Sequence, residues 1–317
     1  MAKMSQWSLA TVMAAVMGFV FLAAAPAFAQ SAADVWKKVE AQWESVKSYE
    51  CTLFNYGFTT PSFIKNFPEH VDKDTKPGWG YRVFKIKFKK PDNVILEYRE
   101  SLNENMNDPD MIDSAIAYVL TYVPGTKFMY GQKDTKRIYI VFPYISDSKF
   151  KELPIPDTKK GQMKLLMVAS RTEVYHEDPN TLKDNRGNKL SETSIGLKIK
   201  QYKHYLTDGK VTVDKVKLPR KSDFVLNKKT GELTFKSGTG PEAIRLTMVP
   251  KDVKKNRGIT KAEVYVDPKT YMIAGLTEYE GAKLVQVQMF EDLTLNPSLP
   301  DSLWTDLWKG RKLSDTR

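Results

Sequence analysis

A hydrolase that works through a covalent intermediate needs a nucleophile, a base and a group that orients the base, all close together in space. The sequence contains one cysteine, Cys51, and three histidines, His70, His176 and His204. No histidine is near Cys51 in the sequence, and a Gly-x-Ser-x-Gly nucleophile elbow is absent. His176 lies beside Glu177, but consecutive residues of an extended segment point in opposite directions, so we interpret it as a surface-loop residue. These residues indicate no nucleophilic catalysis.

Two other patterns are incomplete as reaction centres. Glu278 and Glu280 are spaced to share a strand face, but spacing alone does not identify a glycosidase pair. The segment Gly238-Thr239-Gly240 lacks the lysine and the helix start of a phosphate-binding loop. The single cysteine excludes an intrachain disulfide and a cysteine-based zinc site. We therefore predict that the protein is not an enzyme, and we expect no catalytic residues, no metal and no cofactor.

The amino terminus is typical of an export signal. Lys3 is the only charge in the first thirty residues, a long apolar stretch follows it, and Ala27-Phe28-Ala29 places small residues at positions −3 and −1 of a cleavage site. An uncleaved membrane anchor is the alternative, because the apolar stretch approaches spanning length. The alanine-rich end favours cleavage. We expect residues 1–29 to be removed and residues 30–317 to form a single domain that is soluble in the periplasm.

The composition is that of a globular protein with a strongly basic balance. The 317 residues are 41% hydrophobic and 27% charged, and they carry a formal net charge of +11. Such a charge is typical of proteins that bind nucleic acid. The predicted export argues against such a partner, so we expect the protein to bind no nucleic acid. An anionic membrane surface or an envelope protein remains as a partner for the basic surface. Most lysines are interpreted as the solvated faces of half-buried strands.

The elements that must position any site begin with a helix. Trp36, Val39, Trp43 and Val46 recur at spacings of three and four, which predicts an amphipathic helix with one aromatic stripe. Ser31 or Asp34 can cap its start. Such a stripe is more often core packing than a ligand contact.

Beyond this helix the apolar residues recur at every second position. Phe84, Ile86 and Phe88 alternate with lysines, Pro91-Asp92-Asn93 follows as a turn, and Val94–Arg99 continues as a second strand. Further strand candidates, Thr193–Tyr205 and Lys283–Leu295 among them, are joined by short glycine turns. The polar stretch Asp178–Asn188 is interpreted as a surface loop. The fold class expected is mainly β (α+β): a strongly curved antiparallel sheet or half-open β-barrel covered by an N-terminal helix and short helices.

Three turns near the carboxy terminus are predicted to be structural elements. They are centred on Asp267-Pro268, Gly281 and Asn296-Pro297. Asp and Asn side chains can bond their own nearby backbone, and proline presets the turn dihedral.

The carboxy-terminal segment Lys261–Trp304 holds these turns in a fixed order, with Leu299-Pro300-Asp301 and an aromatic residue at its end. This order resembles the end of the periplasmic outer-membrane lipoprotein carrier superfamily, the Lol-type carriers and their uncharacterised relatives. The export signal, the amino-terminal helix and the Lys90-Pro91 turn also occur in the expected positions. The resemblance covers most of the mature chain loosely and the carboxy-terminal segment well.

The resemblance implies a half-barrel in which a helix covers an apolar cavity for acyl chains. Alternate residues of such a sheet point inward and need no polar partner. Candidate cavity residues are the apolar positions of the helix and the first hairpin: Trp36, Trp43, Phe84, Ile86, Phe88, Leu96 and Tyr98. The same residues would serve equally well as a filled core, so cavity and core both remain open.

The sequence departs from the carriers at two positions and in length. In the carriers an arginine precedes the early proline and helps to hold and release the lid, and an aromatic residue follows three positions after the proline; here these positions are Lys90 and Val94. Extra material lies near 103–117 and 151–188. We therefore expect a relative of the carriers that binds lipid or lipoprotein acyl chains. The alternative is a non-carrier envelope sensor or protein-interaction module on the same scaffold.

Overall fold

The computed structural model describes residues 30–71, 76–91, 93–103, 125–131, 134–143, 146–152, 161, 164, 173–177, 186–227, 229–305, 309 and 312–315. The expected export signal lies outside these residues, as do almost all of the first expected insertion and most of the second.

The strands are β1 (Ser48–Thr59), β2 (Gly78–Lys89), β3 (Asn93–Asn103), β4 (Lys127–Gly131), β5 (Asp134–Val141), β6 (Glu173–Glu177), β7 (Gly209–Lys217), β8 (Phe224–Leu226), β9 (Leu233–Phe235), β10 (Glu242–Pro250), β11 (Lys261–Val266), β12 (Ile273–Glu280), β13 (Lys283–Leu295) and β14 (Lys312–Asp315). The α-helices are α2 (Ala32–Ser45), α3 (Pro61–Asn66), α5 (Asp147–Glu152), α7 (Ile195–Lys203), α8 (Tyr205–Asp208) and α9 (Ser302–Thr305). The 3-10 helices are η1 (Pro68–His70), η3 (Leu190–Thr193) and η4 (Lys221–Asp223).

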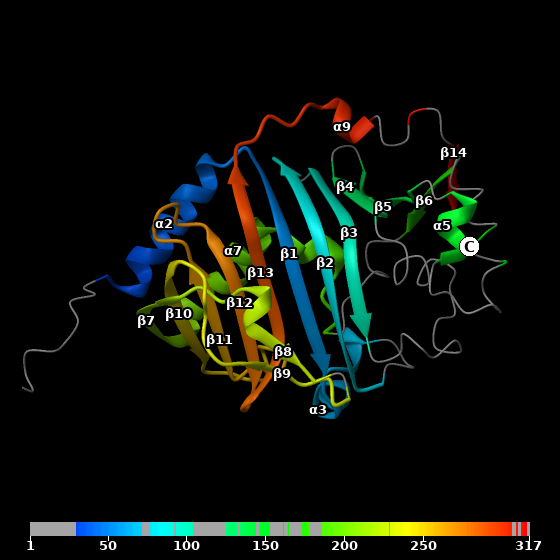
Figure 1. Cartoon of the computed structure of the whole chain (residues 1–317). Helices are drawn as coiled ribbons and strands as arrows, with labels where there is room; N and C mark the ends of the chain where they lie inside the picture. The colour runs from blue at the N-terminus through cyan, green and yellow to red at the C-terminus, as the bar shows by residue number, and fades with distance from the viewer. Residues whose placement is uncertain are drawn as a thin grey trace, which may run out of the picture.

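Twelve of these strands form one open sheet. Its order is β14-β6-β5-β4-β3-β2-β1-β13-β12-β11-β10-β7, and the outermost strands β14 and β7 do not pair with each other. Neighbours are antiparallel except β14 and β6, which are parallel. The sheet curves around α7, which lies behind its central strands (Figure 1). The predicted fold class, a curved antiparallel sheet that is not closed and that helices cover, is confirmed.

The predicted first hairpin is present as β2 and β3. Phe84, Ile86 and Phe88 pair with Tyr98, Leu96 and Val94 across the two strands, so all six side chains lie on one face. Phe128 on β4 continues this face beside Leu96. Because side chains alternate, the lysines of β2 lie on the opposite face.

The predicted amino-terminal helix is α2. Ser31 caps it, because its hydroxyl oxygen accepts a hydrogen bond from the Asp34 backbone N–H at 3.1 Å while the Asp34 carboxylate accepts from Ser31. Val35, Trp36 and Val39 are buried on one side of the helix, and Trp43 is half-buried near its end.

The strand expected over Thr193–Tyr205 is wrong, because this segment forms η3, α7 and the start of α8. Ser194 caps α7, its hydroxyl oxygen accepting from the Leu197 backbone N–H. Ile195, Ile199 and Tyr202 are buried at spacings of four and three, which is a helical face.

The other face of the sheet is covered by the small β8–β9 hairpin, which Figure 1 shows in front of the central strands. Phe224 of β8 lies 6.1 Å, ring centroid to ring centroid, from Phe54 of β1. The Tyr56 hydroxyl donates to the Gly231 carbonyl at 2.6 Å. Among the residues described, no helix is long and apolar enough to cross a membrane.

Candidate functional site

The residues predicted to line a cavity lie together in one apolar cluster: Trp36, Trp43, Phe84, Ile86, Phe88, Leu96 and Tyr98. All except Trp43 are at most 2% exposed. The cluster is densely aromatic, with Phe84 centred 6.0 Å from Tyr98 and 6.5 Å from Phe128. The structure therefore brings the predicted residues together, while their role in binding stays a prediction.

One end of this apolar face is filled by stacked rings. Phe88 stacks on Tyr49 with centroids 4.9 Å apart, and Trp43 of α2 lies 5.4 Å from Phe88. Such aromatic pairs stabilise beyond the area that they bury. Phe88 and Trp43 are therefore packed as core.

Lys90 connects the first hairpin to α2, whereas Val94 packs within the hairpin. The Lys90 ammonium donates to the carbonyls of Trp43 and Glu44 at 2.8 and 3.1 Å, and lies 5.1 Å from the centroid of the Trp43 ring. A cation on the last carbonyls of a helix is favourable. Val94 is buried beside Phe88. The position that the resemblance associates with a lid thus contacts the end of the covering helix, and its part in release stays a prediction.

The three predicted turns differ in what holds them: local hydrogen bonds at Asp267, backbone conformation at Gly281, and a bond to a distant segment at Asn296. The Asp267 carboxylate accepts from the Lys269 backbone N–H and the Thr270 hydroxyl, both of which follow Pro268 in the turn. Gly281 has a positive φ of 62°, which glycine adopts without strain. Asn296 also has a positive φ, of 54°, and its side-chain oxygen accepts from the Lys47 backbone N–H at 2.7 Å.

The end of β13 is tied to β1 beside Asn296. The Ser48 hydroxyl donates to the Pro297 carbonyl at 2.8 Å. The Asn296 backbone N–H donates to the Ser48 carbonyl, also at 2.8 Å.

Buried amides lie on the same sheet face as the apolar cluster, and the sequence patterns did not indicate them. The Asn55 side-chain oxygen accepts from the amides of Gln286 and Gln288 at 2.9 and 3.2 Å. The Gln286 oxygen accepts from Asn188 at 3.1 Å. Gln288 is 1% exposed, and its Oε1 has no hydrogen-bond partner among the described residues. These side chains make a polar strip inside an apolar face.

Arg186 and Asn188 correct the expected surface loop over Asp178–Asn188, because both are buried. The Arg186 guanidinium lies 3.9 Å from the centroid of the Phe63 ring and donates to Glu280 at 3.3 Å. Burial lowers the pKa of Arg186, and the charges of Glu278 and Glu280 act in the opposite direction. A buried ion pair offsets its desolvation only when further hydrogen bonds satisfy its remaining polar atoms, as the Arg257 carbonyl does for Arg186.

A pocket of about 510 Å³ opens beside this arginine, between α7 and the turn over residues 252–259. Its lining residues are His70, Glu192, Leu197, Lys200, Gln201, His204, Tyr205, Lys255, Asn256, Arg257, Ile259 and Glu278. Tyr205, Ile259 and Glu278 are buried and form its floor, and Glu278 accepts a hydrogen bond of 2.5 Å from the Tyr202 hydroxyl. The glutamates that spacing placed on one strand face are therefore held by separate partners.

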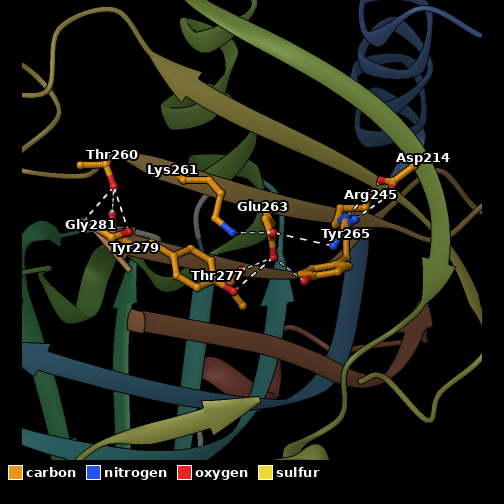
Figure 2. Close-up of polar contacts among 9 residues, drawn as sticks. All are labelled: Asp214, Arg245, Thr260, Lys261, Glu263, Tyr265, Thr277, Tyr279 and Gly281. Carbon is orange, nitrogen blue, oxygen red and sulfur yellow. Dashed lines mark hydrogen bonds and ion pairs between the residues drawn. The ribbon is translucent and has the colours of Figure 1, made fainter. Parts of the chain in front are cut away.

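A second buried carboxylate, Glu263, pairs with Thr277 across β11 and β12, so it lies on the sheet face opposite to that of Glu278. Figure 2 shows the side chains around it. Glu263 accepts hydrogen bonds from Lys261, Tyr265 and Thr277 at 3.0, 2.8 and 3.1 Å. Burial alone would raise the pKa of Glu263, but these bonds and the positive charge of Lys261 lower it below its ordinary value. Burial and the Glu263 charge raise the pKa of neighbouring Tyr279 to about 12.

The arrangement favours structural roles for the reactive residue types that the structure describes. Cys51 is 3% exposed, and burial raises the pKa of its thiol far above its ordinary value, so the nucleophilic thiolate is disfavoured. The carboxylate of Glu263 is held by hydrogen-bond donors on β11 and β12. Among the described residues no group of three or more His, Cys, Asp or Glu side chains is placed to hold a metal.

The fold of this chain is an open, curved sheet with helices on one face. No family model and no curated protein matches the chain. An uncharacterised conserved protein from Thermus thermophilus is similar in structure, with 8% identity, a TM-score of 0.38, and 90% of this chain and 99% of that one covered. A putative outer-membrane lipoprotein-sorting protein domain from Vibrio parahaemolyticus has 12% identity, a TM-score of 0.30, and 88% and 97% covered.

A LolA-superfamily protein from Nitrosomonas europaea has 8% identity, a TM-score of 0.26, and 87% and 97% covered.

Proposed function

We propose that this is an exported envelope protein that shelters the acyl chains of a lipid or lipoprotein against the apolar face of its curved sheet. The observation that carries the proposal is the segregation of side chains on β2, β3 and β4. Buried apolar residues occupy one face: Phe84, Ile86, Leu96, Tyr98 and Phe128. The opposite face carries the charged residues Lys85, Lys87, Glu97 and Lys127. It also holds a smaller buried apolar cluster, in which Ile95 and Met129 pack with Trp304.

An acyl chain suits such a face because methylene groups need no hydrogen-bond partner. Each buried methylene gains roughly 0.8 kcal/mol, so ten of them would gain roughly 8 kcal/mol before the cost of ordering the chain. That gain is of the order needed for micromolar binding. Apolar contact alone therefore provides affinity, without a specific polar recognition group on this face.

The same proposal accounts for the strongly basic surface. The predicted export signal would deliver the protein to a compartment bounded by membranes. Without Lys3 of the predicted signal, the formal net charge of +11 becomes +10, which attracts the chain to anionic headgroups, where acyl chains would be collected or released.

Binding of a fluorescent fatty-acid analogue tests the proposal. The wild type should bind the probe with a change in tryptophan emission, and Ile86→Glu should weaken binding steeply, because a lone charge in an apolar site is costly. Lys85→Glu is the matched control, since it introduces the same carboxylate one residue away on the opposite face. It should bind the probe like the wild type.

A second measurement is needed because Ile86→Glu can also unfold the protein. Organic-solvent extraction of the purified wild type, followed by mass spectrometry, should release co-purified lipid. A wild type that carries no lipid and binds no probe would contradict the proposal and favour the interaction module.

A further inference from the structure

The pocket between α7 and the turn over residues 252–259 has exposed lysines at its mouth. Lys200 projects from α7 and Lys255 from the turn. Neither makes an ion pair with any residue that the structure describes, whereas Lys203 on the same helix is paired with Glu40 at 2.6 Å. Two uncompensated cations from separate elements therefore face one cavity.

A histidine fixes the separation of the two elements that carry these lysines. His204, at the end of α7, has Nδ1 2.6 Å from the Gln201 carbonyl and Nε2 2.8 Å from the Asn256 side-chain oxygen. The Asn256 amide nitrogen donates to the Asp252 carbonyl at 2.7 Å, which sets the orientation of that amide. The helix end and the turn are thus joined by side-chain hydrogen bonds, and the pocket mouth is preorganised.

The third side of the pocket is held by two arginines. Arg257 has a positive φ of 51°, which is uncommon for a residue with a side chain. Its guanidinium donates to Asn188 at 2.9 Å, and its carbonyl accepts from buried Arg186 at 3.2 Å. Backbone in this region persists only where its surroundings fix it.

Three cationic side chains and two carboxylates line the pocket, so its lining carries a net positive charge. The Glu192 carboxylate keeps its charge and accepts from the Lys189 backbone N–H at 3.1 Å. Glu278 lies at the floor, where the Tyr202 hydroxyl and the charge of Arg186 compensate it. An anion is therefore favoured at the mouth, beside Lys200 and Lys255, while the buried Tyr205 and Ile259 side chains accept an uncharged or apolar portion.

We propose that this pocket binds a phosphate-type anion, as a phosphate monoester or diester, at its mouth. A phosphate presents oxygens in several directions and suits cations that converge from separate elements. The source of the group is either a soluble phosphate ester or a phospholipid headgroup. The site goes beyond the acyl-binding function and does not depend on it.

Calorimetric titration at a fixed, near-physiological salt concentration tests this site. The probes are inorganic phosphate, glycerol 3-phosphate and a short-chain phosphatidic acid below its micellar concentration. The wild type should bind at least one of them, and Lys200→Ala combined with Lys255→Ala should lower that affinity by about tenfold or more. The matched control is Lys229→Ala combined with Lys236→Ala, which removes the same charge from exposed positions near the β8–β9 hairpin and should bind like the wild type.

The outcomes distinguish a soluble phosphate ester from a phospholipid headgroup, and they distinguish this proposal from the acyl-binding proposal. Similar affinities for the soluble probes and the lipid would assign a soluble ester, and binding of the lipid alone would assign a headgroup. Binding to none of the probes, or equal losses in both double variants, would overturn the site. Lipid binding that is lost in Ile86→Glu but kept in the Lys200 and Lys255 variant would overturn the pocket and leave the acyl-binding face intact.

Discussion

Glu263 is an example of a charge whose burial is compensated residue by residue. It is 5% exposed, and its oxygens accept from Lys261, Tyr265 and Thr277. Arg245, which forms two hydrogen bonds with Asp214, also approaches Glu263 at 3.7 Å. Removing one partner from such a cluster costs more than the cluster contributes as a whole, because the remaining groups stay buried and unpaired.

The first prediction at this scale concerns Glu263→Gln. The amide keeps the shape but loses the charge, and we expect a loss of about 1–3 kcal/mol in the free energy of unfolding at pH 7. Because the pKa of Glu263 is lowered in the folded state, its contribution is fully present above the unfolded pKa and is lost as the pH falls through the folded pKa. Urea denaturation between pH 7 and about pH 3 should show that the free energies of unfolding of the wild type and the variant converge in acid. A constant difference would contradict the assignment.

Asn296 gives a second prediction, which separates backbone conformation from hydrogen bonding. Alanine at this position would lose the bonds from the Lys47 and Ser48 backbone N–H groups and would strain the positive φ, so Asn296→Ala should cost about 2 kcal/mol. Asn296→Gly loses only these bonds and should cost about 1 kcal/mol. Chemical denaturation should rank the proteins Asn, Gly, Ala. Equal stabilities of the alanine and glycine variants would show that the positive φ of Asn296 carries no energetic cost.

At the scale of elements, α7 shows where sequence patterns reach their limit. The β2–β3 hairpin was predictable because each strand has one apolar and one wet face over several residues. Over 193–205 the apolar residues fit a period of two and a helical face about equally well, and so short a segment does not distinguish them. Packing on the sheet determines that this segment is helical. At the start of α7 the Tyr49 hydroxyl accepts a hydrogen bond from the Ile195 backbone N–H.

The contact between α2 and α7 yields the next prediction. A Cβ added at Gly196 would overlap the six-membered ring of Trp43, so Gly196→Ala must displace α7 or the indole. We expect a loss of about 1–3 kcal/mol and a shift in tryptophan emission. Gly161→Ala is the control, because an added Cβ there meets no atom within 4 Å. Unchanged emission and stability in Gly196→Ala would contradict close packing of the two helices.

At the scale of the whole molecule, the curved sheet and its apolar face were predictable and the polar interior was not. Alternation fixes which residues share a face, and that sufficed for Phe84, Ile86 and Leu96. The buried amide strip joins Asn55, Asn188 and Gln286, which meet only because β1 pairs with β13 and because a polar segment turns inward. No local spacing encodes such a meeting. The basic pocket arises in the same way, from α7 and a distant turn.

The pairing of β1 with β13 also constrains how the chain folds. Ser48 and Asn296, which are joined by a hydrogen bond at the end of this pair, are 248 residues apart in the sequence. Until β13 has been synthesised, one edge of β1 has no partner, and closing so long a loop is slow. The centre of the sheet therefore forms only after the strands between β1 and β13 have been synthesised. The predicted export of this chain as an unfolded polypeptide is compatible with such an order of folding, because the centre of the sheet cannot assemble before β13 has crossed the membrane.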